Sequence, residues 1–91
     1  MAITQTQDNY FRSKWVQNAN LNDYRTTGFY YVYTGCSNAP ESYGWMLVMA
    51  EASREYTCQM FIKSGAIWVR AYTGNPLAWT SWTKFTGTVV S

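Results

Sequence analysis

Aromatic side chains restrict the possible folds of this 91-residue chain more than any other feature, because they make up 19% of it. The sequence contains four Phe, five Trp and eight Tyr, whereas leucine occurs only at positions 21, 47 and 77. Helical bundles are built on Leu and Ala, while aromatic residues favour strands. Charged residues are 13% of the chain, about half of the usual ~25%. This composition predicts an all-β domain and excludes a disordered tail.

Five segments after residue 20 are separated by turn signals and are predicted to be strands. They are 29–33, 45–50, 56–62, 67–72 and 79–85. The turn at Lys63–Ala66 has a Ser-Gly pair suited to positive φ, and short connections of this kind are typical of an antiparallel meander. The predicted fold class is therefore all-β: a small antiparallel meander of about five strands, forming a compact knob with a short N-terminal lead-in segment.

The first twenty residues differ from the rest of the chain. We predict residues 1–20 to be an N-terminal lead-in and oligomer-contact segment, and residues 21–91 to be the β knob domain. Asp8 is placed to cap a short helix in which Phe11 and Trp15 are four residues apart, and an extended lead-in is equally compatible. A helix this short is not stable alone, so its aromatic residues need the domain behind it or another chain.

The alternation of residues within the predicted strands indicates how the sheet is buried. The even positions of 56–62 are apolar while Thr57 and Gln59 are polar, which is typical of a half-buried strand. The run 45–50 is apolar on both faces, and one small sheet cannot hide two apolar faces without a second layer. No amphipathic helix follows residue 20. The sheet is therefore expected to fold over itself as a sandwich or barrel, to pack on other subunits, or to present an aromatic face to a ligand.

Charge, hydropathy and cysteine content argue against several classes of partner. The net charge is +2 and the basic residues are scattered singly, whereas nucleic-acid binders cluster theirs. The longest apolar run, Trp45–Ala50, is far short of the ~20 residues that a membrane span needs. The chain has no His, and Cys36 and Cys58 fit no metal-ligand spacing. We expect no nucleic acid, no membrane insertion, no metal and no cofactor, with both thiols free and packed as small apolar groups.

Catalytic chemistry is not expected either. Without His, general acid–base catalysis would depend on the five carboxylates, of which Glu51 and Glu55 share one predicted turn and are more simply solvated there. The sequence has neither a Gly-rich phosphate loop nor a nucleophile that can pair with a His. We therefore predict that the chain is not an enzyme and has no catalytic residues.

Several short motifs, taken in order, resemble the pyocin-knob family. They are Leu21-Asn22, Gly28–Val32, Asn38–Pro40, Gly44–Val48, Gln59, Val69–Tyr72, the Gly74-Asn75 turn and Trp79–Trp82. The resemblance covers about residues 20–85. It implies a small β-rich knob of the kind found in the trimeric tail fibres and tailspikes of bacteriophages and in phage-tail-like bacteriocins. It also implies a homotrimer located in the virion and assembled in the bacterial cytoplasm.

The candidate ligand-binding residues are mostly aromatic. They are Trp68, Arg70, Tyr72, Trp79, Trp82, Tyr43 and Asn75. Because Trp68, Arg70 and Tyr72 alternate along one strand, they share a face. Arg70 is expected to stack between the two flanking rings, where it would either clamp adjacent strands or hold an acidic or hydroxyl-rich glycan.

The closing tryptophans and two polar loops complete the candidate set. Trp79 and Trp82 are three residues apart, so on a regular strand they point to opposite faces. One is then expected in the core and the other as a platform on which a sugar ring stacks, unless both are core or subunit contacts. Tyr43 belongs to the long loop 34–44 and Asn75 to a turn, positions suited to specificity.

Two functions are favoured at this stage, and a capsule hydrolase or lyase is a minor third that would need two carboxylates facing each other in a groove. The first is a non-enzymatic knob domain of a phage tail fibre or tailspike, homotrimeric, which contributes to host attachment by binding a bacterial surface polysaccharide or other glycan. Each site would be weak, and three would act by avidity. The second is a structural trimerisation and folding-registration domain of a tail fibre with no ligand of its own.

Overall fold

The structure, a computed structural model, describes residues 13–53 and 55–91. Its elements are β1 (Lys14–Val16), the 3-10 turn η1 (Leu21–Asp23), β2 (Gly28–Val32), β3 (Gly44–Ala50), β4 (Thr57–Lys63), β5 (Ala66–Thr73), β6 (Ala78–Trp79) and β7 (Thr83–Thr86). All strands belong to one sheet. The all-β prediction is confirmed, with a few more strands than expected.

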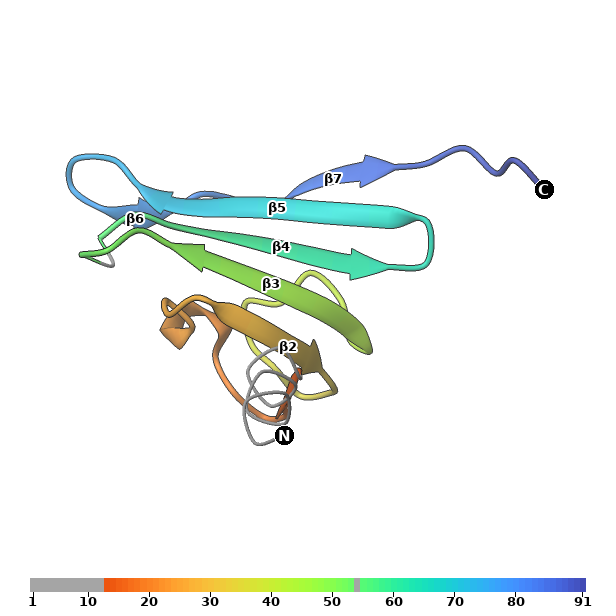
Figure 1. The fold of residues 1–91 in the computed structure, drawn as a ribbon, viewed down its shortest axis with the longest axis horizontal. Helices are drawn as coiled ribbons and strands as arrows, with labels where there is room; N and C mark the ends of the chain where they lie inside the picture. The colour runs from red at the N-terminus through yellow and green to blue at the C-terminus, as the bar shows by residue number, and fades with distance from the viewer. Residues whose placement is uncertain (1–12, 54) are drawn as a thin grey trace, which may run out of the picture.

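Strands β2 to β5 form an antiparallel meander and lie side by side in Figure 1. β1 adds to the free edge of β2 in the parallel direction. At the other edge, β5 pairs with both β6 and β7. Lys14 and Trp15 are thus extended rather than helical, whereas Asp8 and Phe11 lie outside the described residues.

The predicted strand 79–85 is divided into two, because the chain leaves the ladder between β6 and β7. Two hydrogen bonds between Ala71 and Thr80 connect the interrupted segment to β5. The Thr80 N–H donates to the Ala71 carbonyl at 2.8 Å, and the Ala71 N–H donates to Thr80 Oγ1 at 3.0 Å. A side-chain hydroxyl therefore replaces one ladder acceptor. This local change sets the direction of the two tryptophans discussed below.

Two backbone positions need the residues that the sequence supplies. In the β4–β5 turn, Ser64 and Gly65 both have positive φ, 35° and 76°, as a tight two-residue hairpin requires. At the start of β3, a Cβ on Gly44 would lie 2.3 Å from the Phe61 ring. Glycine there lets the Phe61 side chain pack directly against the β3 backbone.

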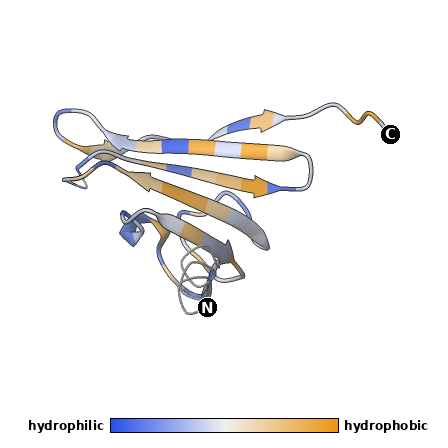
Figure 2. Cartoon of the chain, in the orientation of Figure 1, coloured by the Kyte–Doolittle hydropathy of each residue, from blue (hydrophilic) through white to orange (hydrophobic). Residues whose placement is uncertain are grey.

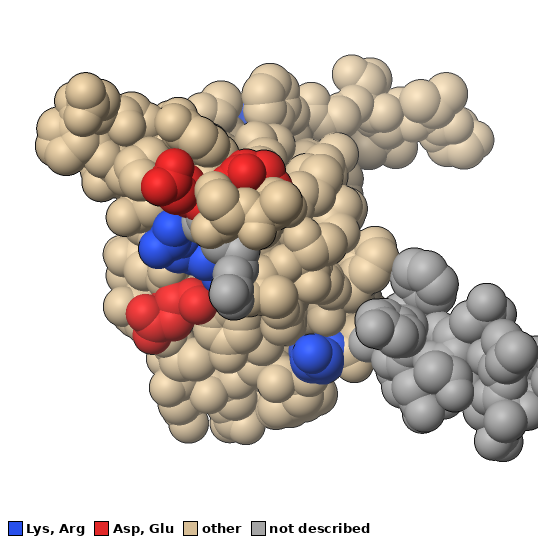
Figure 3. All heavy atoms as spheres, turned by 60° about the vertical axis from the view of Figure 1, so that its left-hand side comes forward, with Lys and Arg blue, Asp and Glu red and all other residues tan. Residues whose placement is uncertain are grey.

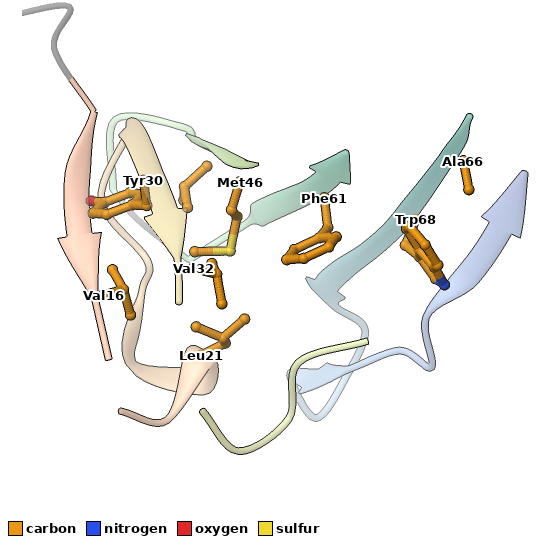
Figure 4. Packing of buried hydrophobic residues seen from close by; sticks show 9 residues of the cluster. Val16, Leu21, Tyr30, Val32, Met46, Phe61, Ala66 and Trp68 are labelled. Atoms are coloured by element: carbon orange, nitrogen blue, oxygen red, sulfur yellow. The ribbon is translucent and has the colours of Figure 1, made fainter. Parts of the chain in front are cut away.

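The hydrophobic core lies on one face of the sheet, the covered face. Its buried residues are Val16, Leu21, Tyr30, Val32, Met46, Val48, Phe61, Ala66 and Trp68, which are the sticks in Figure 4. The second layer is irregular chain: Leu21 from η1 is fully buried, and Cys36 and Ala39 from the 33–43 loop pack against the cluster. Phe61 and Trp68 meet edge to face, with ring centroids 5.6 Å apart.

The burial of β4 is the reverse of the predicted pattern. Thr57, Gln59 and Phe61 are on the covered face, while Cys58 is half-buried and Ile62 is exposed. Gln59 is fully buried because its amide finds hydrogen-bond partners inside the protein, as described below, which removes most of the cost of burying a polar group. The bulky Phe61 ring supplies the apolar contact on that side.

The opposite face of the sheet, the open face, is almost entirely apolar. Alternation and strand register place on it Phe29, Tyr31, Trp45, Leu47, Met49, Cys58, Met60, Ile62, Ile67, Val69 and Ala71, continued by Trp15 on β1 and Phe85 on β7. Apolar residues recur along the strands in Figure 2. Within the described residues the chain forms neither a sandwich nor a barrel, so the expectation that the sheet folds over itself is not met there.

Two further findings bear on the expectations for partners. Among the described residues, no helix has the length and apolarity needed to cross a membrane. Cys36 and Cys58 are both free and half-buried, Cys36 against the core and Cys58 on the open face.

Candidate functional site

Arg70 is a buried cation in contact with two indole rings. It lies in β5 on the covered face and is only 5% exposed. Its guanidinium carbon is 4.0 Å from the ring centroid of Trp79 and 4.7 Å from that of Trp82. Both distances are within the range of cation–π attraction, which strengthens as the cation is desolvated.

The hydrogen bonds of Arg70 satisfy only part of its guanidinium. Nε donates to Gln59 Oε1 at 2.8 Å, and Nη1 donates to Asn22 Oδ1 at 2.9 Å. Nη2 is buried and has no partner in the part of the chain that the structure describes. The single salt bridge found among the described residues joins Lys63 to Glu41, so no described carboxylate neutralises Arg70. Burial lowers the pKa of Arg70 to about 10.

Gln59 connects Arg70 to the chain that crosses the covered face. Its Nε2 donates to the carbonyl oxygens of Leu21 at 2.7 Å and Tyr24 at 2.9 Å, while its Oε1 accepts from Arg70. The amide thus uses both ends, which fixes η1 above β4. That position brings Asn22 to the guanidinium.

A second set of contacts fixes the two tryptophans. Trp82 Nε1 donates to the Asn38 carbonyl at 2.9 Å, and Asn38 Nδ2 donates to Asn20 Oδ1 at 2.8 Å. The Trp79 ring lies 5.2 Å from that of Tyr72, across the β5–β6 pair. Both tryptophans are half-buried, so part of each ring faces solvent.

These residues surround a small surface hollow of about 240 Å³. It is lined by Asn22, Asn38, Arg70, Trp79, Thr80, Ser81 and Trp82. The lining combines two aromatic rings, one cation, two amides and two hydroxyls. Aromatic faces stack on the CH groups of a sugar ring, and the polar groups match its hydroxyl oxygens, so the arrangement is suited to one sugar unit.

The structure brings together only part of the predicted set. Arg70, Trp79 and Trp82 line the hollow and Tyr72 supports Trp79. Trp68 does not take part, because it is buried in the core against Phe61. Arg70 therefore stacks on Trp79 and Trp82, not between Trp68 and Tyr72 as predicted.

The remaining predicted positions lie elsewhere. Tyr43 is half exposed and packs against Tyr33, with ring centroids 5.2 Å apart. Asn75 is exposed in the β5–β6 turn. Neither lines the hollow. The expectation that Trp79 and Trp82 point to opposite faces is wrong, because the chain leaves the ladder at Thr80 and both rings reach Arg70.

Sequence reasoning missed the polar partners of Arg70. Asn22 and Gln59 belong to the motifs that carried the family resemblance, but nothing in their local pattern shows that they converge on Arg70. Asn22 is 48 residues from Arg70. Only the strand register and the position of η1 bring them together.

Other candidate sites are less suitable. A larger hollow of about 510 Å³ is lined by Asn22, Asp23, Arg25, Thr26 and Ser53 and lacks an aromatic platform. The described residues contain no group of three His, Cys, Asp or Glu side chains placed to hold a metal ion. On the face shown in Figure 3, several charged side chains lie near one another and a separate cation lies apart, on an otherwise uncharged surface.

The glutamate turn has a local structural role. Glu51 accepts hydrogen bonds from the Ser53 hydroxyl and from the Ser53 and Glu55 N–H groups, and the Ser53 bonds lower the pKa of Glu51. The carboxylate is thereby engaged by its own turn, which is how an exposed acidic residue organises a tight loop.

Comparison of this chain with protein-family models, curated proteins and solved structures finds no match.

Proposed function

We propose that this chain is a non-enzymatic knob domain of a bacteriophage tail fibre, tailspike or phage-tail-like bacteriocin, which attaches to a bacterial surface glycan as a homotrimer in the virion. The observation that carries the proposal is the buried Arg70, held against Trp79 and Trp82 at a surface hollow. Among the described residues, Arg70 has neither a carboxylate partner nor a hydrogen-bond acceptor for its Nη2 atom.

A buried donor without an acceptor costs free energy, more so when it carries charge. An oxygen of a bound sugar supplies the missing acceptor, and a carboxylate of an acidic sugar also supplies the missing negative charge. Because Nη2 has almost no exposed surface, an oxygen reaches it only when side chains that line the hollow shift to admit it. The proposed ligand is therefore a hydroxyl-rich glycan, with acidic units bound more tightly than neutral ones.

One hollow of this size holds about one sugar unit, so each site is expected to be weak. Three linked sites raise the overall affinity without new contacts, provided that their spacing matches the repeat of the polysaccharide. A homotrimer would supply the three sites.

The alternative is a structural domain that trimerises a tail fibre and binds no ligand. One observation favours it: the same contacts also fasten the irregular layer to the sheet. Gln59 holds η1 through two carbonyls, and Trp82 holds the 33–43 loop through Asn38. In this case Arg70 is only a clamp between strand and loop.

Glycan-array binding of the full chain tests the proposal, with the oligomeric state of the sample measured first. We expect hits enriched in acidic polysaccharides. An assembled sample that binds none of the arrayed glycans at high protein density would favour the structural alternative.

Hits are then titrated with two site variants and one control. Trp79→Ala removes a ring from the hollow, and Arg70→Lys keeps the charge but loses the planar stacking and the bidentate fork. Each is expected to weaken binding at least ~10-fold, a loss of about 1.4 kcal/mol. Tyr43→Ala, an exposed aromatic outside the hollow, should bind normally. Equal affinities for all three variants would refute this location of the site.

A further inference from the structure

The open face is the largest surface that the proposed site leaves unexplained. Its central positions are unusually exposed for apolar side chains: Trp45 is 50% exposed, and its neighbours Ile62 and Ile67 are 42% and 38% exposed. Strand register places these three residues in one row across β3, β4 and β5. Scattered apolar residues on a surface need no explanation, but a contiguous patch does.

The row extends across the whole sheet. On one side, the Trp45 ring lies 4.8 Å from Tyr31, which lies 5.5 Å from Trp15 on β1. On the other side, Ile67 pairs with Phe85 on β7, which is 57% exposed. A second row of Phe29, Leu47, Met60 and Val69 runs beside it. The patch therefore spans six strands and has no interruption by a charged side chain.

The patch is large enough to form the centre of an interface. Strands about 4.8 Å apart with about 6.6 Å between residues of one face give the thirteen open-face positions roughly 400 Å² in plan. This is about half of the ~800 Å² that each partner contributes to a standard interface. A largest exposed apolar patch of about 300–600 Å² is often functional.

We infer that the open face is an interface between copies of this chain, in which the open faces of the copies meet around a shared symmetry axis. The face carries no Asp, Glu, Lys or Arg, so a contact with itself brings no like charges together and leaves none unpaired. It equally offers nothing to a charged partner. Closed rotational symmetry brings the same face of every copy to the axis, so the apolar rows of the copies can form one buried interior.

This assembly leaves the Arg70 hollow accessible. Arg70 and Trp68 are on the covered face, and the apolar rows are on the other side of the same strands. Association and glycan binding therefore do not compete for surface. The inference rests on the proposed function only for the number of copies, which is three there.

Multi-angle light scattering and sedimentation of the full chain test the interface, using Ile62→Lys and a matched control. Ile62 is exposed, so lysine there is tolerated by the folded chain alone but is buried without a partner in the assembly. Because burying an unpaired charge is costly, we expect association to weaken about 100-fold or more. Val89→Lys adds the same charge at a position that is 91% exposed and off the sheet, and its mass should equal that of the unchanged protein.

Thiol labelling gives a second readout. Cys58 lies on the open face, while Cys36 packs against the core. In the assembled protein, alkylation of Cys58 should be slow, and in Ile62→Lys it should accelerate while that of Cys36 stays the same.

The outcomes separate this inference from the proposed function. A protein that is monomeric at all concentrations, or an assembly that survives Ile62→Lys, overturns the interface. Either result is expected if another segment of the chain or a lipid vesicle covers the open face instead. A mass of two chains that Ile62→Lys reduces to one supports the interface and refutes the trimer. Glycan binding by a monomer supports the site and overturns the interface.

Discussion

Replacing the buried glutamine at the centre of the covered face tests the network on which the site depends. Gln59→Leu keeps approximately the shape of the side chain but removes its donor and acceptor atoms. Tyr24 O and Arg70 Nε then lose the partners that Gln59 supplies, at 2.9 and 2.8 Å. Leu21 O loses one bond but still accepts from the Tyr24 N–H at 3.2 Å, so its loss is smaller.

The expected cost follows from these three atoms. A buried group left without a partner costs about 1–3 kcal/mol, with the higher values for charged groups. Because Arg70 Nε belongs to a cation, the cost of leaving it unpaired lies near the upper end of this range. The summed loss of stability for the three atoms is therefore about 4 kcal/mol. The free energy of unfolding of a domain this size is about 5–14 kcal/mol. Gln59→Leu should therefore remove a large part of the stability.

Urea titration followed by tryptophan fluorescence, at one protein concentration, measures this loss. With a slope of about 1–1.5 kcal/mol per molar urea, the midpoint should fall by roughly 3 M. Gln17→Leu is the matched control, since Gln17 is exposed and its side-chain oxygen accepts one hydrogen bond from Trp15 Nε1, at 3.2 Å, among the described residues; the change in stability should stay within about 0.5 kcal/mol. A loss below about 1 kcal/mol for Gln59→Leu would refute the role given to this network.

Three further perturbations test other parts of the fold. Trp68→Ala empties a buried site in the core and should cost about 3–5 kcal/mol in thermal or urea unfolding; near-normal stability would mean that Trp68 is not core. Gly44→Ala places a Cβ 2.3 Å from the Phe61 ring and should cost about 1–3 kcal/mol by overpacking, so an unchanged midpoint would contradict the close packing. Burial raises the pKa of the Tyr24 and Tyr30 phenols. Their contribution to stability is therefore complete below pH ~10 and is lost as the pH rises through the folded-state pKa. Tyr30→Phe should lessen that alkaline loss, measured as unfolding free energy against pH with phenolate absorbance as the monitor.

Strands β2 to β5 and the tight turn between β4 and β5 were predictable from local signals, but the burial of β4 was not. The run 56–62 has β propensity and clear limits, and Ser64-Gly65 is compatible with the positive φ values that a tight hairpin requires. Which face is inside depends on what lies across it, and Gln59 is buried because two carbonyls from distant chain satisfy its amide. Alternation alone treats glutamine as an outward residue.

The site shows the same limit. The stacking of Arg70 on aromatic rings was predictable, because it lies among aromatic residues on a strand face. Its actual neighbours Trp79 and Trp82 depend on the interruption at Thr80, and the bond to Asn22 depends on η1. The pairing of distant strands decides these contacts, and the spacing of residues along the sequence does not reveal that pairing.

The short outer strands bear on how far any association of this protein can proceed. β1 has three residues and carries Lys14, and β7 has four and carries Lys84, whose Nζ lies 5.2 Å from the Trp68 ring centroid. Short edge strands that carry a lysine resist pairing with a strand from a neighbouring molecule. Growth of the sheet into a fibril by edge-to-edge pairing is thereby discouraged.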